Sequence, residues 1–119
     1  MDALDLHSRL STALVLYLGL LGLWGIVLGL IGSGPTPSFR GALVVVEIAI
    51  AAQGLLGIVS WPSSGPPDAM HVLYGAALLL AIPLAASIVR AGSPRRTSLT
   101  LGLAALFAAG LAIRGMNTA

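Results

Sequence analysis

The stretch Gln53–Gly75, QGLLGIVSWPSSGPPDAMHVLYG, joins the end of one apolar segment to the start of another and decides the fold. Its centre, SWPSSGPPD, is rich in proline, glycine and serine, which interrupt a helix. His71, one of two histidines in the chain, follows this break near the beginning of the next apolar segment. The stretch therefore predicts two helices joined by a short loop, with a histidine near the start of the second one.

The composition predicts an integral membrane protein. Of the 119 residues, 57% are hydrophobic and 8% are charged, and the apolar residues form long blocks. A soluble domain carries about 25% charged residues. The absence of cysteine excludes disulfides, thiolate metal sites and cysteine nucleophiles. The excess of positive charge reflects scarce acids, since there are four acidic and six basic residues. Nucleic acid is therefore not an expected partner.

Four apolar segments extend from this centre in both directions, at about residues 10–31, 41–59, 69–89 and 99–113. A helix needs about 20 apolar residues to cross a bilayer core of about 30 Å. Short connections between the segments predict an all-α, up-down-up-down four-helix bundle, which forms a single transmembrane domain over residues 1–119.

Small residues and a proline add detail to this bundle. Pro83 lies inside the third segment and predicts a kink there. A stripe of glycines on the first segment predicts close helix packing within the bundle or in an oligomer. Its members are Gly22, Gly25, Gly29 and Gly32.

The arginines predict the orientation in the membrane. Connections on one side of the bundle carry Arg40, Arg90, Arg95 and Arg96, so this side is expected to face the cytoplasm. Both termini would then lie outside the cell (inner) membrane. The first and third helices start on this outer side, so His7 and His71 are expected at similar depth.

Two histidines at matched depth on separate helices are the axial ligands that b-type haem needs, and they would bind its iron. Gly75 follows His71 by one helical turn and leaves room for a flat macrocycle. Tyr74, beside it, is expected either to pack at the interface or to orient a ligand ring. The alternative is that both imidazoles are ordinary interfacial side chains.

Arg9 and Arg114 both fall near the outer end of the bundle. A guanidinium pairs well with a carboxylate, so both are candidates to pair with the haem propionates.

The same stretch resembles part of haem A synthases, in which a Q-x-x-L-G helix end is followed by a proline-containing loop and a ligand histidine. The matching positions are Gln53, Leu56, Gly57, Pro62, Pro67 and His71. LHSRL around His7 is similar to the family's His-Arg pair, although Ser8 separates the two residues here. The resemblance implies one four-helix half of such an enzyme, holding haem b between two histidines. Electron transfer or haem modification, as a homodimer or alone, would follow. It names no catalytic residue.

Glu47 lies near the middle of the second apolar segment. A charged carboxylate there costs at least about 2.5 kcal/mol. Glu47 is therefore expected either to be protonated and hydrogen-bonded to a neighbouring helix or subunit, or to form a proton or cation site. Two further functions fit the chain. One is a small proton-coupled multidrug-type transporter that uses Glu47, and the other is a non-catalytic accessory subunit of a respiratory or photosynthetic membrane complex.

Overall fold

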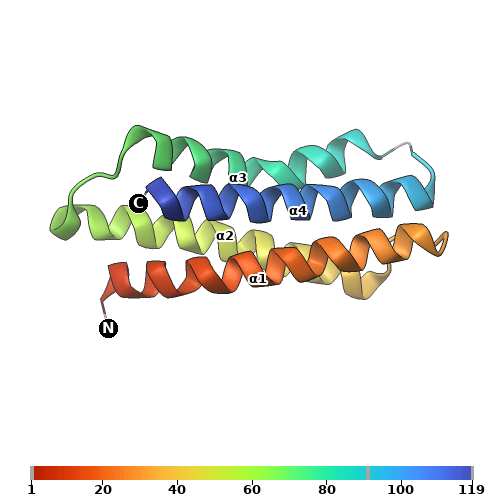
Figure 1. Ribbon diagram of the computed structural model, residues 1–119, viewed down its shortest axis with the longest axis horizontal. Coiled ribbons are helices and arrows are strands. Elements are labelled where there is room, and N and C mark those ends of the chain that lie inside the picture. Colours follow the sequence, from red (N-terminus) through yellow and green to blue (C-terminus); the bar gives the residue numbers. More distant parts are fainter. Residues whose placement is uncertain (1, 91, 119) are drawn as a thin grey trace.

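The computed structural model describes residues 2–90 and 92–118 as four antiparallel helices (Figure 1). They are α1 (Ala3–Leu30), α2 (Pro37–Ser64), α3 (Ala69–Ile88) and α4 (Pro94–Thr118). All four are long and apolar enough to cross a membrane. The predicted all-α, up-down-up-down bundle is therefore confirmed, and the chain is a multi-pass membrane protein.

Each helix begins at a polar residue that caps its free backbone N–H groups. Asp2 accepts a hydrogen bond from the Asp5 N–H, and Thr36 accepts one from the Phe39 N–H. Asp68 caps α3, and Ser93 accepts from the Arg96 N–H at the start of α4. Such caps stabilise a helix by about 1 kcal/mol each, so these residues fix where the helices start.

The helices are longer than the predicted spans. α1 begins at Ala3, so His7 lies within a helix and not before it. The expectation that SWPSSGPPD closes the second helix after residue 59 was wrong, because α2 continues through Pro62 to Ser64. Serine hydroxyls form hydrogen bonds within this last part, where Ser64 Oγ donates to the Ser60 carbonyl at 2.7 Å. Gly65 then ends the helix with φ +82°, a backbone angle that favours glycine.

The glycines of α1 lie against α4, as the stripe predicts. A Cβ atom on Gly25 would stand 2.7 Å from the Gly102 Cα, so the two backbones are in direct contact. On Gly22 and Gly29 an added Cβ would clash with leucine side chains of α4. Gly32 does not belong to this contact, because it lies in the turn after α1 with φ +80°. The stripe is therefore a packing surface inside the bundle.

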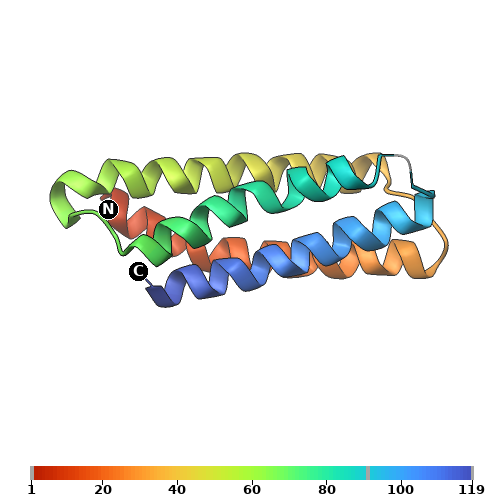
Figure 2. The same ribbon diagram turned by 90° about the horizontal axis from the view of Figure 1, so that it is seen from above.

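The order of the helices around the bundle places α1 against α2 and α4, and α3 against α4 (Figures 1 and 2). α2 also borders α3, and this pair of helices packs less closely than the other three pairs. The core between the helices is apolar, and Leu18, Phe39 and Ala105 are fully buried in it. Looser packing of α2 against α3 leaves space on that side of the bundle.

The two ends of the bundle differ in character. Both chain termini lie at one end (Figure 1), together with the loop between α2 and α3. The other end holds the two remaining connections, which are joined where Ser98 Oγ donates to the Ser33 carbonyl at 2.8 Å. The side chains of Arg40, Arg90, Arg95 and Arg96 are all exposed at this second end. The ends are called the terminal end and the arginine end below.

Candidate functional site

A cavity of about 870 Å³ occupies the terminal end of the bundle, and residues of all four helices line it. Binding sites for small molecules and cofactors span about 300–1,000 Å³. Most of the lining is apolar. The polar residues of the lining are His7, Ser11, Gln53, Ser60, Ser64, Asp68, His71, Tyr74 and Thr118. The cavity is therefore large enough for a cofactor and carries polar groups at selected points.

The two histidines face each other in this cavity. His7 comes from α1 and His71 from α3, and their ring centroids are 6.0 Å apart with an angle of 67° between the ring planes. Both helices run in the same direction, because one antiparallel helix separates them in the chain. The prediction that the two imidazoles lie at the same depth is confirmed.

Each imidazole is held by a backbone carbonyl. His7 Nδ1 lies 3.0 Å from the Gln53 carbonyl oxygen, and His71 Nδ1 lies 2.8 Å from the Gly115 carbonyl oxygen. A carbonyl oxygen can only accept, so Nδ1 carries the proton in both rings. In the neutral ring this leaves the lone pair on Nε2. Metal-binding histidines are commonly held in this way, with the second nitrogen donating to a carbonyl.

The spacing of the rings fits one metal ion between them. A histidine nitrogen binds a metal at about 2.0–2.1 Å. When two rings bind one ion from opposite sides, the centroid separation is twice the sum of the metal–nitrogen distance and the distance from that nitrogen to the ring centroid. This sum gives about 6 Å. The observed separation is 6.0 Å. The centroid separation is therefore compatible with two imidazoles that hold one ion between them.

Gln53 connects α2 to the first turns of α1. Its side-chain amide donates to the His7 carbonyl at 2.6 Å and to Ser11 Oγ at 2.7 Å. Ser11 Oγ in turn donates to the His7 carbonyl at 2.9 Å. One turn further along α2, a Cβ on Gly57 would stand 3.2 Å from Cε1 of the His7 ring. Gln53 therefore holds His7 by hydrogen bonds, and Gly57 leaves room for its ring.

Gly75 and Tyr74 both line the cavity. A Cβ on Gly75 would meet no atom within 4 Å, so this position faces open space. The Tyr74 ring lies 6.0 Å from the guanidinium carbon of Arg114. Arg114 and Arg9 are exposed and are not among the residues that line the cavity. The expected pairing of these arginines with propionates stays a prediction.

Glu47 lies apart from this site. It is half-buried on α2 and does not line the cavity. Its Oε1 atom is buried and has no hydrogen-bond partner among the described residues. The same is true of Gln53 Oε1. The hydrogen bond to a neighbouring helix that was one expectation for Glu47 Oε1 is therefore not formed within residues 2–90 and 92–118.

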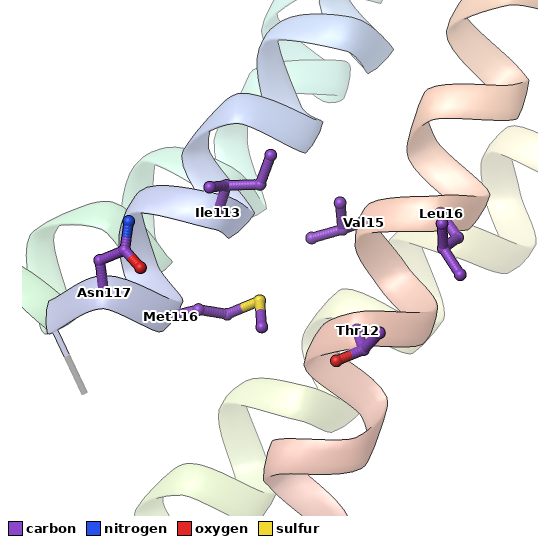
Figure 3. A pocket seen from close by; sticks show the side chains of 6 residues that line it. All are labelled: Thr12, Val15, Leu16, Ile113, Met116 and Asn117. Carbon is purple, nitrogen blue, oxygen red and sulfur yellow. The ribbon is translucent and has the colours of Figure 1, made fainter.

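A smaller pocket of about 190 Å³ lies between α1 and α4 at the terminal end (Figure 3). Thr12, Val15 and Leu16 line it from α1. Ile113, Met116 and Asn117 line it from α4. Met116 also lines the large cavity, so this one side chain borders both spaces. α1 and α4, in backbone contact at their middle, therefore leave room between them near the histidines.

Sequence reasoning missed the groups that hold the imidazoles. Gln53 stood out in the sequence as a position shared with haem A synthases, but its contact with His7 did not. The Gly115 carbonyl has no signature in the sequence, because every residue except the last carries the same group. Thr118 Oγ1, at 3.3 Å from His71 Nδ1, was missed because α4 was expected to end at residue 113.

No protein-family model, curated protein or solved structure matches this chain. The relationship to haem A synthases therefore stays an expectation that rests on the residues quoted above. Within the described part of the chain, no three residues among His, Asp and Glu gather into a metal site. The site is defined by its two histidines and by the cavity around them.

Proposed function

We propose that the chain is a small membrane protein that binds b-type haem, with His7 and His71 as the two axial ligands. One observation carries the proposal: two imidazoles, each with Nδ1 donating to a carbonyl, stand 6.0 Å apart in a cavity of about 870 Å³. The predominantly apolar lining suits the faces of a porphyrin.

The residues of the chain would hold the haem as follows. Nε2 of His7 and of His71 would bind the iron from opposite sides, and the two carbonyls would keep the rings in the correct tautomer. Gly75, which faces open space, would leave room for the edge of the macrocycle. Bound haem would supply a one-electron Fe(III)/Fe(II) couple. If both histidines hold the iron, the haem would serve electron transfer rather than the binding of small gases.

Arg9 and Arg114 are the proposed partners of the propionates. Both are exposed at the terminal end, and Arg114 is already placed beside Tyr74, which lines the cavity. This assignment supports haem binding, and the likeness to one half of a haem A synthase adds haem modification as the second proposed use of the same site.

The distribution of arginines between the two ends supports one orientation of the bundle in the membrane. Four exposed arginines gather there, whereas the terminal end carries Arg9 and Arg114 together with three aspartates, Asp2, Asp5 and Asp68. We infer that the arginine end faces the cytoplasm of a cell (inner) membrane and that both termini lie outside. The haem would then lie near the outer surface. A homodimer, or membership of a respiratory or photosynthetic complex, is compatible with this arrangement.

The absorption spectrum of the purified chain tests the proposal. After expression with ample haem, we expect a red protein with the Soret band and sharp reduced α-band of six-coordinate low-spin haem. His71→Ala and His7→Ala should each remove that spectrum. Ser98→Ala is the control, because it removes a buried hydrogen bond at the arginine end. A colourless wild-type protein that is folded and helical would refute haem binding.

The second candidate function is a proton-coupled transporter that uses Glu47. The buried and unpartnered Oε1 atom of this residue favours it, since such an atom is available to bind a proton or a cationic substrate. Glu47 is not part of the large cavity, so the two functions depend on separate residues and separate variants can test them.

A further inference from the structure

Gln53 touches His7 at two places, its backbone and its ring. The side-chain amide of Gln53 binds the His7 carbonyl, and the backbone carbonyl of the same Gln53 accepts the proton of His7 Nδ1. Within residues 2–90 and 92–118, no other two residues on different helices are joined by two hydrogen bonds, one from each side chain to the backbone of the other. A single residue of α2 thus controls both the position of the His7 backbone and the tautomer of its ring.

The amide of Gln53 uses both of its N–H groups in this contact. One binds the His7 carbonyl and the other binds Ser11 Oγ, one turn later on α1. Gln53 is 8% exposed, so no solvent competes for these hydrogen bonds. Loss of the amide would leave the His7 carbonyl and the Ser11 hydroxyl without this donor in a largely apolar setting, which is unfavourable for buried polar groups.

His71 is held in a different way. Its Nδ1 donates to the carbonyl of Gly115 in the last turn of α4, and that carbonyl also accepts from Thr118 Oγ1 at 2.9 Å. Thr118 Oγ1 itself lies 3.3 Å from His71 Nδ1. No side chain from another helix binds the His71 backbone among the described residues. The two histidines are therefore independent of each other in what holds them, and a change at Gln53 should reach His7 alone.

We propose that Gln53 is the positioning residue that fixes the tautomer and direction of His7, so that Nε2 of His7 is presented to its ligand. The proposal rests on the proposed function in that the ligand is taken to be haem iron. Partners of a metal-bound histidine that lie outside the coordination sphere change metal affinity or activity by about 10–100-fold when they are removed.

The variant Gln53→Leu tests whether the amide holds α1 in place, because leucine keeps the size of the side chain and the backbone carbonyl of residue 53 but lacks the amide. Without the amide, the first turns of α1 should move away from that carbonyl, so that His7 Nδ1 no longer reaches it. The full-length chain is labelled with ¹⁵N-histidine, and the ring nitrogens are observed without haem. In the wild type, His7 should show a protonated Nδ1 and an unprotonated Nε2. In Gln53→Leu the His7 signals should move to those of mixed tautomers, while the signals of His71 stay in place. Unchanged His7 signals, or equal changes in both histidines, would overturn the proposal.

The haem-loaded protein gives a second readout. We expect Gln53→Leu to keep His71 as a ligand and to lose His7, which converts part of the low-spin haem to a five-coordinate high-spin form. Carbon monoxide should then bind the reduced haem at least about tenfold faster than in the wild type, in line with the effect of such partners. Equal rates would contradict the assignment.

Two further variants keep the test decisive. Gln53→Asn keeps an amide that is one methylene too short to reach α1, so it should reproduce the effect of leucine even if Gln53→Leu does not fold. Ser98→Ala, which removes a buried hydrogen bond far from the histidines, should change neither readout. If the wild type binds no haem, the proposed function fails, whereas the ¹⁵N signals of the haem-free protein still decide the role of Gln53.

Discussion

His7 and His71 stand with their ring centroids 6.0 Å apart, on α1 and α3, at the same end of the bundle. They are the only histidines of the chain. Each ring is tied by Nδ1 to a different neighbouring helix, His7 to α2 and His71 to α4. All four helices therefore take part in placing one pair of nitrogen atoms, and this arrangement is the basis for the predictions below.

Acid should release haem from the protein. A histidine must be unprotonated at Nε2 to bind iron, so protons compete with the metal as the pH falls. We expect the low-spin spectrum to be stable at neutral and alkaline pH and to be lost on acidification, and the loss should reverse on neutralisation. Absorption spectra recorded from pH 8 downward would check this. A spectrum that persists after both imidazoles are protonated would exclude histidine ligation.

Gly75→Leu should block the cavity without damage to the fold. A Cβ on Gly75 faces open space, so leucine would extend into the volume proposed for the macrocycle. Replacing a helical glycine also stabilises the helix by up to about 1 kcal/mol. We expect haem binding to weaken at least about tenfold, which is about 1.4 kcal/mol, while the helical circular dichroism is unchanged.

Gly110→Leu is the matched control for that variant. Gly110 also lies within a helix, has open space around its Cβ position and is exposed, but it does not line the cavity. Haem binding should be the same as in the wild type. Equal losses of haem in both variants would show that leucine acts through the fold and not through the cavity.

Gly25→Ala should loosen the contact between α1 and α4. The new Cβ would lie 2.7 Å from the Gly102 Cα, and two backbones cannot move apart as easily as a flexible side chain. We expect a loss of about 1–3 kcal/mol in the free energy of unfolding, which is typical of overpacking. Thermal unfolding in detergent, followed by circular dichroism, measures it as a lower Tm.

Gly19→Ala is the corresponding control on the same helix. An added Cβ at Gly19 meets no atom within 4 Å, so the substitution should be neutral or slightly stabilising. If Gly25→Ala were equally harmless, the close approach of Gly25 and Gly102 would not contribute to stability.

Glu47→Gln should leave the haem spectrum unchanged, because Glu47 does not line the cavity. The same variant tests the transporter: binding of a cationic substrate that depends on pH in the wild type should be lost when the carboxyl group is replaced. Loss of the haem spectrum in Glu47→Gln would show that this residue acts on the haem site through the bundle. Retained pH-dependent binding would remove Glu47 from the transport hypothesis.

Much of the fold could be predicted because a membrane protein repeats one simple requirement. A segment that crosses lipid must satisfy its own backbone hydrogen bonds, so long apolar runs become helices and the polar breaks become connections. The packing role of Gly22, Gly25 and Gly29 could also be predicted locally, since residues three or four apart share one helix face, whereas Gly32 lies in the turn after α1. Helix ends were less predictable, because Pro62 is compatible with a last helical turn that serine hydroxyls support.

The sequence by itself determined that there are four membrane-spanning helices and that they alternate in direction. It also determined that the two helices that carry the histidines start at the same end of the bundle. These features follow from apolar length and from helix count. Only the tertiary structure decided that the two imidazoles face each other, that carbonyls of Gln53 and Gly115 hold them, and that a cavity surrounds them. The rotation of each helix about its axis decides these contacts, and that rotation depends on side-chain packing between helices, which no single segment of the sequence contains.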